Sequence, residues 1–133
     1  MADISAIEGI GPAFEAKLDA AGVKSVEKLL EVGATSAGRK DLEEKTGIDE
    51  KRLLEWVNRA DLMRLKGVGS QLSDLLEASG VDSVPELAQR NAENLHAKMT
   101  EINETKNLVN RLPSLKEIED WVEEAKSLPK VVS

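Results

Sequence analysis

The 133-residue sequence contains no cysteine, no tyrosine and a single histidine. Without cysteine, the chain forms no disulfide and offers no thiolate to a metal ion. One histidine, His96, cannot build a histidine-clustered metal site or a cysteine–histidine catalytic pair. Because only Phe14, Trp56 and Trp121 are aromatic, the core must be aliphatic, which favours packing of helix on helix. We therefore expect a protein with no metal, no cofactor and no enzymatic activity.

Long apolar runs are also missing. No stretch approaches the roughly 20 apolar residues that a membrane-spanning helix needs. The first residues, Met1-Ala-Asp-Ile, do not resemble the basic and then apolar start of a signal peptide. We expect a soluble, cytoplasmic protein that does not enter a membrane.

Positive charge is scarce relative to negative charge. With 18 Lys and Arg against 25 Asp and Glu, the formal net charge is -7. A negative field opposes the approach of a polyanion such as DNA, although a local basic patch is compatible with it.

Against these absences stands an internal repeat. A shift of 58 positions superimposes residues 3–30 on residues 61–88, and ten of the 28 aligned positions are identical. Later in each copy, Trp56-Val-Asn-Arg-Ala corresponds to Trp121-Val-Glu-Glu-Ala with an offset of 65. We therefore predict an all-α protein of two tandem, closely packed units, 1–60 and 61–133, with about five short helices in each.

The pattern of apolar residues is helical almost throughout, and no segment alternates as a strand does. Asp3 and Asp61 are each predicted to cap the start of a short helix. In the second unit we predict a short helix around 108–112, broken by Pro113, and then a capping box from Ser114 to Glu117. The tail 130–133 is predicted to be frayed.

Each copy begins with an apolar-Gly-apolar-Gly turn that leads into a helix. Glycines permit the unusual φ angles of such a turn and a close approach to its backbone. Consecutive amides at a helix start, together with the helix dipole, suit one phosphate oxygen. The apolar neighbours of these glycines are expected to anchor the turns in the core: Ile7, Ile10, Leu65 and Val68.

These two segments resemble helix-hairpin-helix motifs, which occur in polymerases, ligases, repair nucleases and the N-terminal domains of recombinases. The resemblance implies a turn that grips the DNA backbone without sequence preference. Nearly the whole chain also resembles a bacterial family of unknown function with tandem units of this kind. That likeness is carried by Ile7–Pro12, Thr46–Ile48, Glu55–Arg64 and Asn94–Lys98.

The two hairpins are not equal candidates for a phosphate site. The second, hairpin 2, offers two cations, two glycines and small polar donors: Arg64, Lys66, Gly67, Val68, Gly69, Ser70 and Gln71. The first, hairpin 1, offers Gly9, Ile10 and Gly11, but has Glu8 in the place of Lys66 and Pro12 in the place of Ser70. We therefore predict hairpin 2 as the phosphate site and hairpin 1 as the weaker one. Other basic residues, Arg39 and Arg59 among them, would extend the surface.

Two functions fit this pattern. The leading hypothesis is binding of the phosphate backbone of double-stranded DNA without sequence specificity. The alternative is a protein–protein interaction or adaptor module that binds no nucleic acid, because paired glycines also serve as plain packing turns. Trp56 and Trp121 lie on apolar helical stripes, which predicts core packing and not base stacking.

Overall fold

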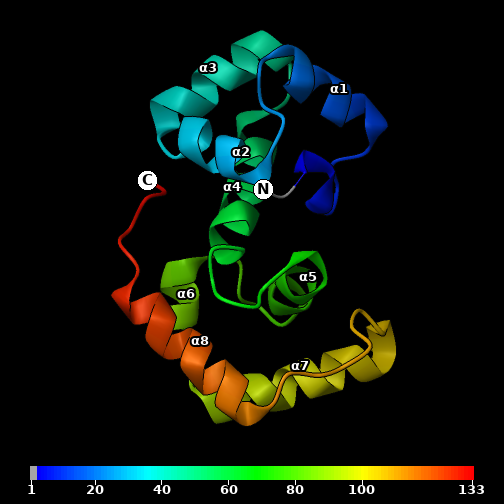
Figure 1. The fold of residues 1–133 in the computed structure, drawn as a ribbon, viewed down its shortest axis with the longest axis vertical. Helices are drawn as coiled ribbons and strands as arrows, with labels where there is room; N and C mark the ends of the chain where they lie inside the picture. The colour runs from blue at the N-terminus through cyan, green and yellow to red at the C-terminus, as the bar shows by residue number, and fades with distance from the viewer. Residues whose placement is uncertain (1–2) are drawn as a thin grey trace. The chain divides into compact units, whose positions relative to one another are not determined.

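The computed structural model describes residues 3–133, and within them the regular structure is entirely helical (Figure 1). The only strand-like feature of these residues is an isolated bridge between Asp3 and Ser25. The elements are η1 (Ile4–Ala6), α1 (Pro12–Ala20), α2 (Val26–Gly33), α3 (Ser36–Thr46), α4 (Glu50–Leu62), α5 (Ser70–Ala78), α6 (Val84–Ala88), α7 (Ala92–Lys106) and α8 (Leu115–Ser127). The predicted all-α class is confirmed.

The described chain divides into two compact units. Unit 1 extends to Asp61 and includes Lys130–Ser133, whereas unit 2 comprises Leu62–Pro129. Unit 1 contains η1, α1–α3 and almost all of α4, and unit 2 contains α5–α8. Among residues 3–133, the second unit thus has four helices and not the expected five.

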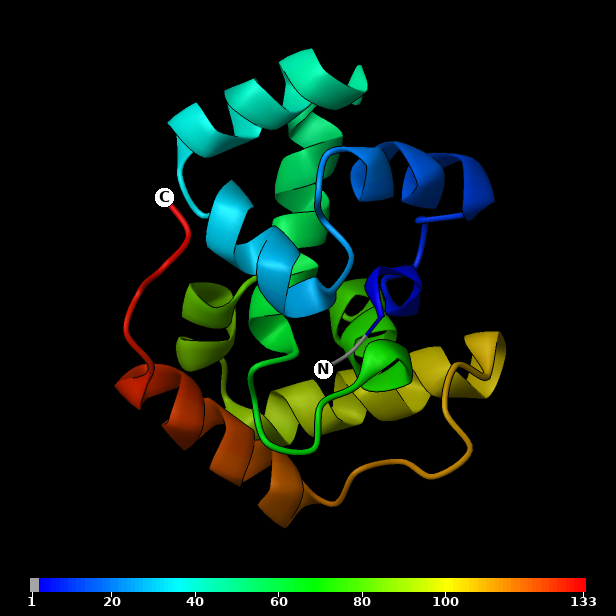
Figure 2. The ribbon, with the colours of Figure 1, turned by 45° about the horizontal axis from the view of Figure 1, so that its top comes forward.

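In unit 1, η1 packs against α1 and α2, and α3 packs against both of these helices. Figure 2 shows α1 and α3 lying close to each other. Leu18, Leu29 and Leu53 are fully buried in this unit. The N-terminal cap at Asp3 is as predicted, because its carboxylate accepts a hydrogen bond from the Ser5 N–H at 2.9 Å.

In unit 2, α8 packs along α6 and α7, and α5 packs against α7 (Figure 1). The inward faces of these helices and the turn before α5 form one apolar cluster, which includes Leu65, Val68, Leu76, Met99 and Trp121. The predicted capping box is confirmed: the Ser114 side chain accepts from the Glu117 N–H, and the Glu117 carboxylate accepts from the Ser114 N–H. Consequently α8 has a fixed start and presents one face to the rest of the unit.

The prediction that a short helix begins at Asp61 is wrong. Asp61 lies inside α4, which runs without interruption from Glu50 to Leu62, and its side chain is buried. No glycine or proline separates Glu50 from Leu65, so nothing stops the helix early. Hairpin 2 therefore follows directly from a long helix, whereas hairpin 1 follows a short 3₁₀ turn.

The prediction of a short helix around 108–112 is also wrong. Helix α7 continues to Lys106 and ends at Asn107, whose φ of 49° is left-handed. Beyond it, the Asn103 side chain donates to the Val109 carbonyl at 3.1 Å and accepts from the Val109 N–H at 3.0 Å. Because one amide side chain satisfies both backbone groups of Val109, this segment has less need of helical hydrogen bonds.

Replacing Asn103 with alanine should loosen this connection and destabilise unit 2. Each net hydrogen bond contributes about 0.5–1.5 kcal/mol, so a loss of about 1–2 kcal/mol is expected. Chemical denaturation of the full chain measures it, with Thr105→Ala at an exposed position of α7 as the control. A midpoint unchanged in Asn103→Ala would contradict the assigned role.

The frayed tail predicted for 130–133 is likewise not what the structure has. The Ser133 N–H donates to the Ala34 carbonyl at 2.8 Å, and the Arg39 guanidinium donates to the Ser133 carbonyl. Arg39 is buried and also donates to the carbonyls of Gly33 and Ala34, at 2.8 and 3.1 Å. It therefore ties the end of α2 to the tail, in place of the surface role that the sequence suggested.

Candidate phosphate-binding turns

Buried apolar side chains anchor hairpin 2 in the core of unit 2. Leu65 and Val68 are buried, and the Val68 N–H donates to the Leu65 carbonyl at 3.1 Å. Gly67 has a φ of 85°, which favours glycine. The predicted anchoring is confirmed here and in hairpin 1, where Ile7 and Ile10 are buried.

The start of α5 leaves its amides open. Its N-cap residue, Gly69, provides no side-chain hydrogen bond, and within residues 3–133 the N–H groups of Gly69, Ser70 and Gln71 donate to no protein acceptor. Helix α1 is alike, with Gly11 at its N-cap and Pro12 as its first residue. By contrast, α2, α3, α6, α7 and α8 are capped by side chains, those of Ser25, Thr35, Ser83, Asn91 and Ser114.

Open space surrounds three of the four hairpin glycines. A Cβ atom built at Gly11, Gly67 or Gly69 would meet no atom within 4 Å. The φ of Gly67 accounts for its glycine, but Gly69 has an extended backbone with a φ of -105°, which any residue adopts. The fold therefore does not require glycine at position 69. Because Gly69 has no side chain, the first amides of α5 stay uncovered.

The charges around hairpin 2 are mixed. Lys66 is exposed beside Gly67. Arg64 is half-buried, and its guanidinium donates to the Pro129 carbonyl at 3.1 Å. A carboxylate also reaches the turn, because Glu124 of α8 accepts a hydrogen bond from the Lys66 N–H at 3.1 Å. Hairpin 2 thus carries the cationic side chains of Arg64 and Lys66 and also receives a carboxylate from α8.

Hairpin 1 is less suited to an anion. Glu8 is exposed next to Gly9, and Pro12 removes one N–H from the start of α1. Gly9 has a φ of 96°, and a Cβ there would lie 3.3 Å from the Trp56 indole nitrogen. The turn is therefore open at Gly11 but closed over by tryptophan at Gly9.

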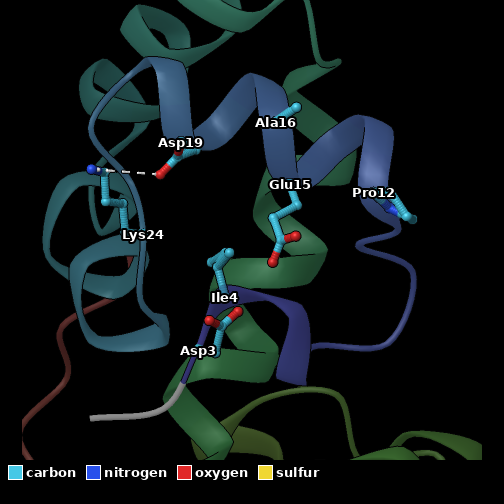
Figure 3. Close-up of a pocket in the computed structure, with 7 residues that line it drawn as sticks. All are labelled: Asp3, Ile4, Pro12, Glu15, Ala16, Asp19 and Lys24. Atoms are coloured by element: carbon cyan, nitrogen blue, oxygen red, sulfur yellow. Dashed lines mark ion pairs between the residues drawn. The ribbon is translucent and has the colours of Figure 1, made fainter.

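An acidic cavity of about 390 Å³ lies beside hairpin 1, between η1 and α1 (Figure 3). Asp3, Glu15 and Asp19 line it, with Lys24 3.8 Å from the Asp19 carboxylate. The Ser5 N–H hydrogen-bonds to the Asp3 carboxylate and lowers its pKa, so this group stays charged at neutral pH. Three carboxylates against one lysine make this face of unit 1 repel anions.

Some basic residues that the sequence suggested for the surface are buried. Arg59, like Arg39, is buried and adds no cation to an exposed surface. Trp56 and Trp121 are each 4% exposed, which confirms core packing. Sequence reasoning missed Glu124 as a neighbour of hairpin 2. The repeat gave no signal for this contact, because the residue aligned with Glu124 in the first copy is Arg59.

Within residues 3–133, no helix combines the length and apolar character that crossing a membrane requires. In the same residues, no three histidine or acidic side chains gather closely enough to hold a metal ion.

Comparison with known proteins identifies a family but no function. A family model described as a domain of unknown function, DUF4332, matches residues 8–128. This agrees with the expected family of unknown function. No curated protein and no solved structure matches the chain.

Proposed function

We propose a function from the turns themselves, since the chain belongs to DUF4332, a family described as a domain of unknown function. The protein binds the phosphate backbone of double-stranded DNA through hairpin 2, without sequence specificity and without catalysis, in the cytoplasm. Unit 2, as a helix-hairpin-helix unit, supplies the contacts. The amides of Gly67 and Gly69 and the side chains of Arg64, Lys66 and Ser70 hold the phosphate oxygens.

One observation carries this proposal: α5 begins with uncapped, uncovered amides next to an exposed lysine. The helix dipole and unpaired N–H groups attract an anion at such a start. Backbone donors recognise phosphate without reading bases. Since hairpin 1 faces Glu8 and the acidic cavity, one protein molecule makes few phosphate contacts, and binding is weak.

A salt titration tests the proposal. Each neutralised phosphate contributes about 0.9 to the slope of log affinity against log salt, so hairpin 2 should give a slope of about two to four. Fluorescence anisotropy of a labelled duplex measures it, with two unrelated sequences to check that affinity does not depend on the bases. Absence of binding at low salt would reject the DNA function.

The second candidate is a protein-interaction module that binds no nucleic acid. The acidic cavity of unit 1 favours it, because Asp3, Glu15 and Asp19 suit a basic side chain of a partner. The same titration separates the two functions. A chain that ignores duplex DNA at low salt but binds a lysine-rich peptide, and loses that binding in Asp19→Asn, fits the interaction module.

A further inference from the structure

Helix α8 holds hairpin 2 by both backbone groups of one residue. The Lys66 N–H donates to the Glu124 carboxylate at 3.1 Å, and the Lys66 carbonyl accepts from the Trp121 indole N–H at 3.0 Å. Trp121 and Glu124 are three residues apart, so they share one face of α8. The side chains of Trp121 and Glu124 thus both hydrogen-bond to the backbone of Lys66, which lies more than 50 positions earlier in the chain.

A third tie reaches the same turn. The Arg64 guanidinium donates to the Pro129 carbonyl, two residues beyond the end of α8. Trp121 is almost fully buried, so its indole N–H needs a partner inside the protein, and Lys66 supplies it. Directly after Lys66 come Gly67 with its left-handed φ and then the open amides of α5.

Unit 1 repeats the tryptophan but exchanges the charges. The Trp56 indole nitrogen lies 3.3 Å from the position of a Cβ atom at Gly9. The Trp121 indole N–H instead donates to the Lys66 carbonyl, and the space at the Cβ position of Gly67 is open. In the aligned repeats, Glu8 stands where unit 2 has Lys66, and Arg59 stands where unit 2 has Glu124. Both units therefore have a tryptophan at the turn. In each unit, the residue three positions after the tryptophan carries the charge opposite to that of the turn residue, so Arg59 matches Glu8 and Glu124 matches Lys66.

From these contacts we infer that α8 sets both the shape and the strength of the phosphate site, an inference that rests on the proposed DNA function. Trp121 is a positioning residue that fixes the Lys66 backbone so that the following amides face outward. Glu124 is a built-in anion: it holds the Lys66 N–H and places a negative charge beside the bound phosphate. Its carboxylate therefore keeps the affinity of hairpin 2 low.

Two substitutions at Glu124 separate geometry from charge. Glutamine retains a carbonyl acceptor for the Lys66 N–H but loses the charge, so duplex affinity should rise about two- to fivefold. Alanine loses the acceptor as well, and the Lys66 N–H should exchange with solvent about tenfold faster, as measured by NMR on the full chain. The control is Glu123→Gln, which removes an exposed neighbouring charge paired with Lys126 at 3.1 Å and should leave both measurements within about twofold.

Trp121→Phe tests the positioning role. The ring keeps most of the packing but loses the N–H, which leaves the Lys66 carbonyl unpaired. Lys66 exchange should quicken about tenfold, and duplex affinity should fall at least about threefold. The opposite signs expected for Glu124→Gln and Trp121→Phe distinguish this arrangement from a general loss of stability.

The exchange measurement needs no DNA, so the two proposals fail separately. A Lys66 N–H that is unprotected in the wild type, or equally protected in Glu124→Ala, overturns the grip by α8. Equal gains in affinity for Glu124→Gln and Glu123→Gln overturn the local effect of the carboxylate. A protected Lys66 N–H with no duplex binding by the wild type or by Glu124→Gln rejects the DNA function and leaves the grip supported.

Discussion

Replacing Gly69 with aspartate is expected to weaken DNA binding by more than about tenfold while making unit 2 slightly more stable. Aspartate is a favoured N-cap residue, and its carboxylate can accept from the open amides of α5. The extended backbone of Gly69 and the empty space around it admit the side chain. A gain of a few tenths of a kcal/mol over glycine is therefore expected.

The same carboxylate takes the place of the phosphate. Hydrogen bonds to a charged group contribute about 1.5–3 kcal/mol, so losing one such contact and adding a like charge should weaken binding by more than about tenfold. Thermal unfolding and anisotropy on the same sample measure the two effects. Stability and affinity that fall together would mean that Gly69 serves the fold and not a ligand.

Hairpin 1 provides the matched control for this change. Gly11 also has an extended backbone, an uncapped helix start and open space at its Cβ position. Gly11→Asp should therefore give a similar gain in stability. Because hairpin 1 is not the assigned site, duplex affinity should change less than about twofold. A large loss of binding in Gly11→Asp would move the site to hairpin 1.

The sequence predicts the helical fold well where local signals decide it. Glycines with left-handed φ angles at positions 22, 47 and 80 follow the last turns of their helices, and the caps at Asp3 and Ser114 lie where the sequence predicts them. These features depend on a few neighbouring residues, and a single sequence contains all of them. The all-α class then follows because no segment competes for a strand.

The errors arise where individual side-chain contacts, and not the apolar pattern, decide the structure. The 108–112 segment has a helical apolar pattern, but Asn103 binds Val109 and holds it in another conformation. The tail docks on Ala34 and Arg39, which no local pattern reveals. At the candidate site, the open turn could be predicted from its glycines. The Glu124 carboxylate at the Lys66 N–H could not, since it comes from a helix with its own solvated polar face.

Exchanging the charges of the two hairpins should move the phosphate site from one to the other. Lys66→Glu removes a cation and adds an anion beside Gly67, so duplex affinity should fall by about tenfold or more, and the salt slope should fall by about one. Glu8→Lys places a cation next to Gly9 in a turn that already has Gly11 open to solvent. Affinity should then rise about threefold in an otherwise unchanged chain.

The double variant makes the test specific, because Lys66→Glu with Glu8→Lys leaves the net charge at -7. If only the overall field mattered, the double variant would bind as the wild type does. We expect weaker binding than the wild type, because hairpin 1 lacks the N–H that Pro12 removes and borders the acidic cavity, but stronger binding than Lys66→Glu alone. Affinity unchanged by Lys66→Glu itself would show that hairpin 2 does not hold the phosphate, and unit 2 would then lose its assigned role.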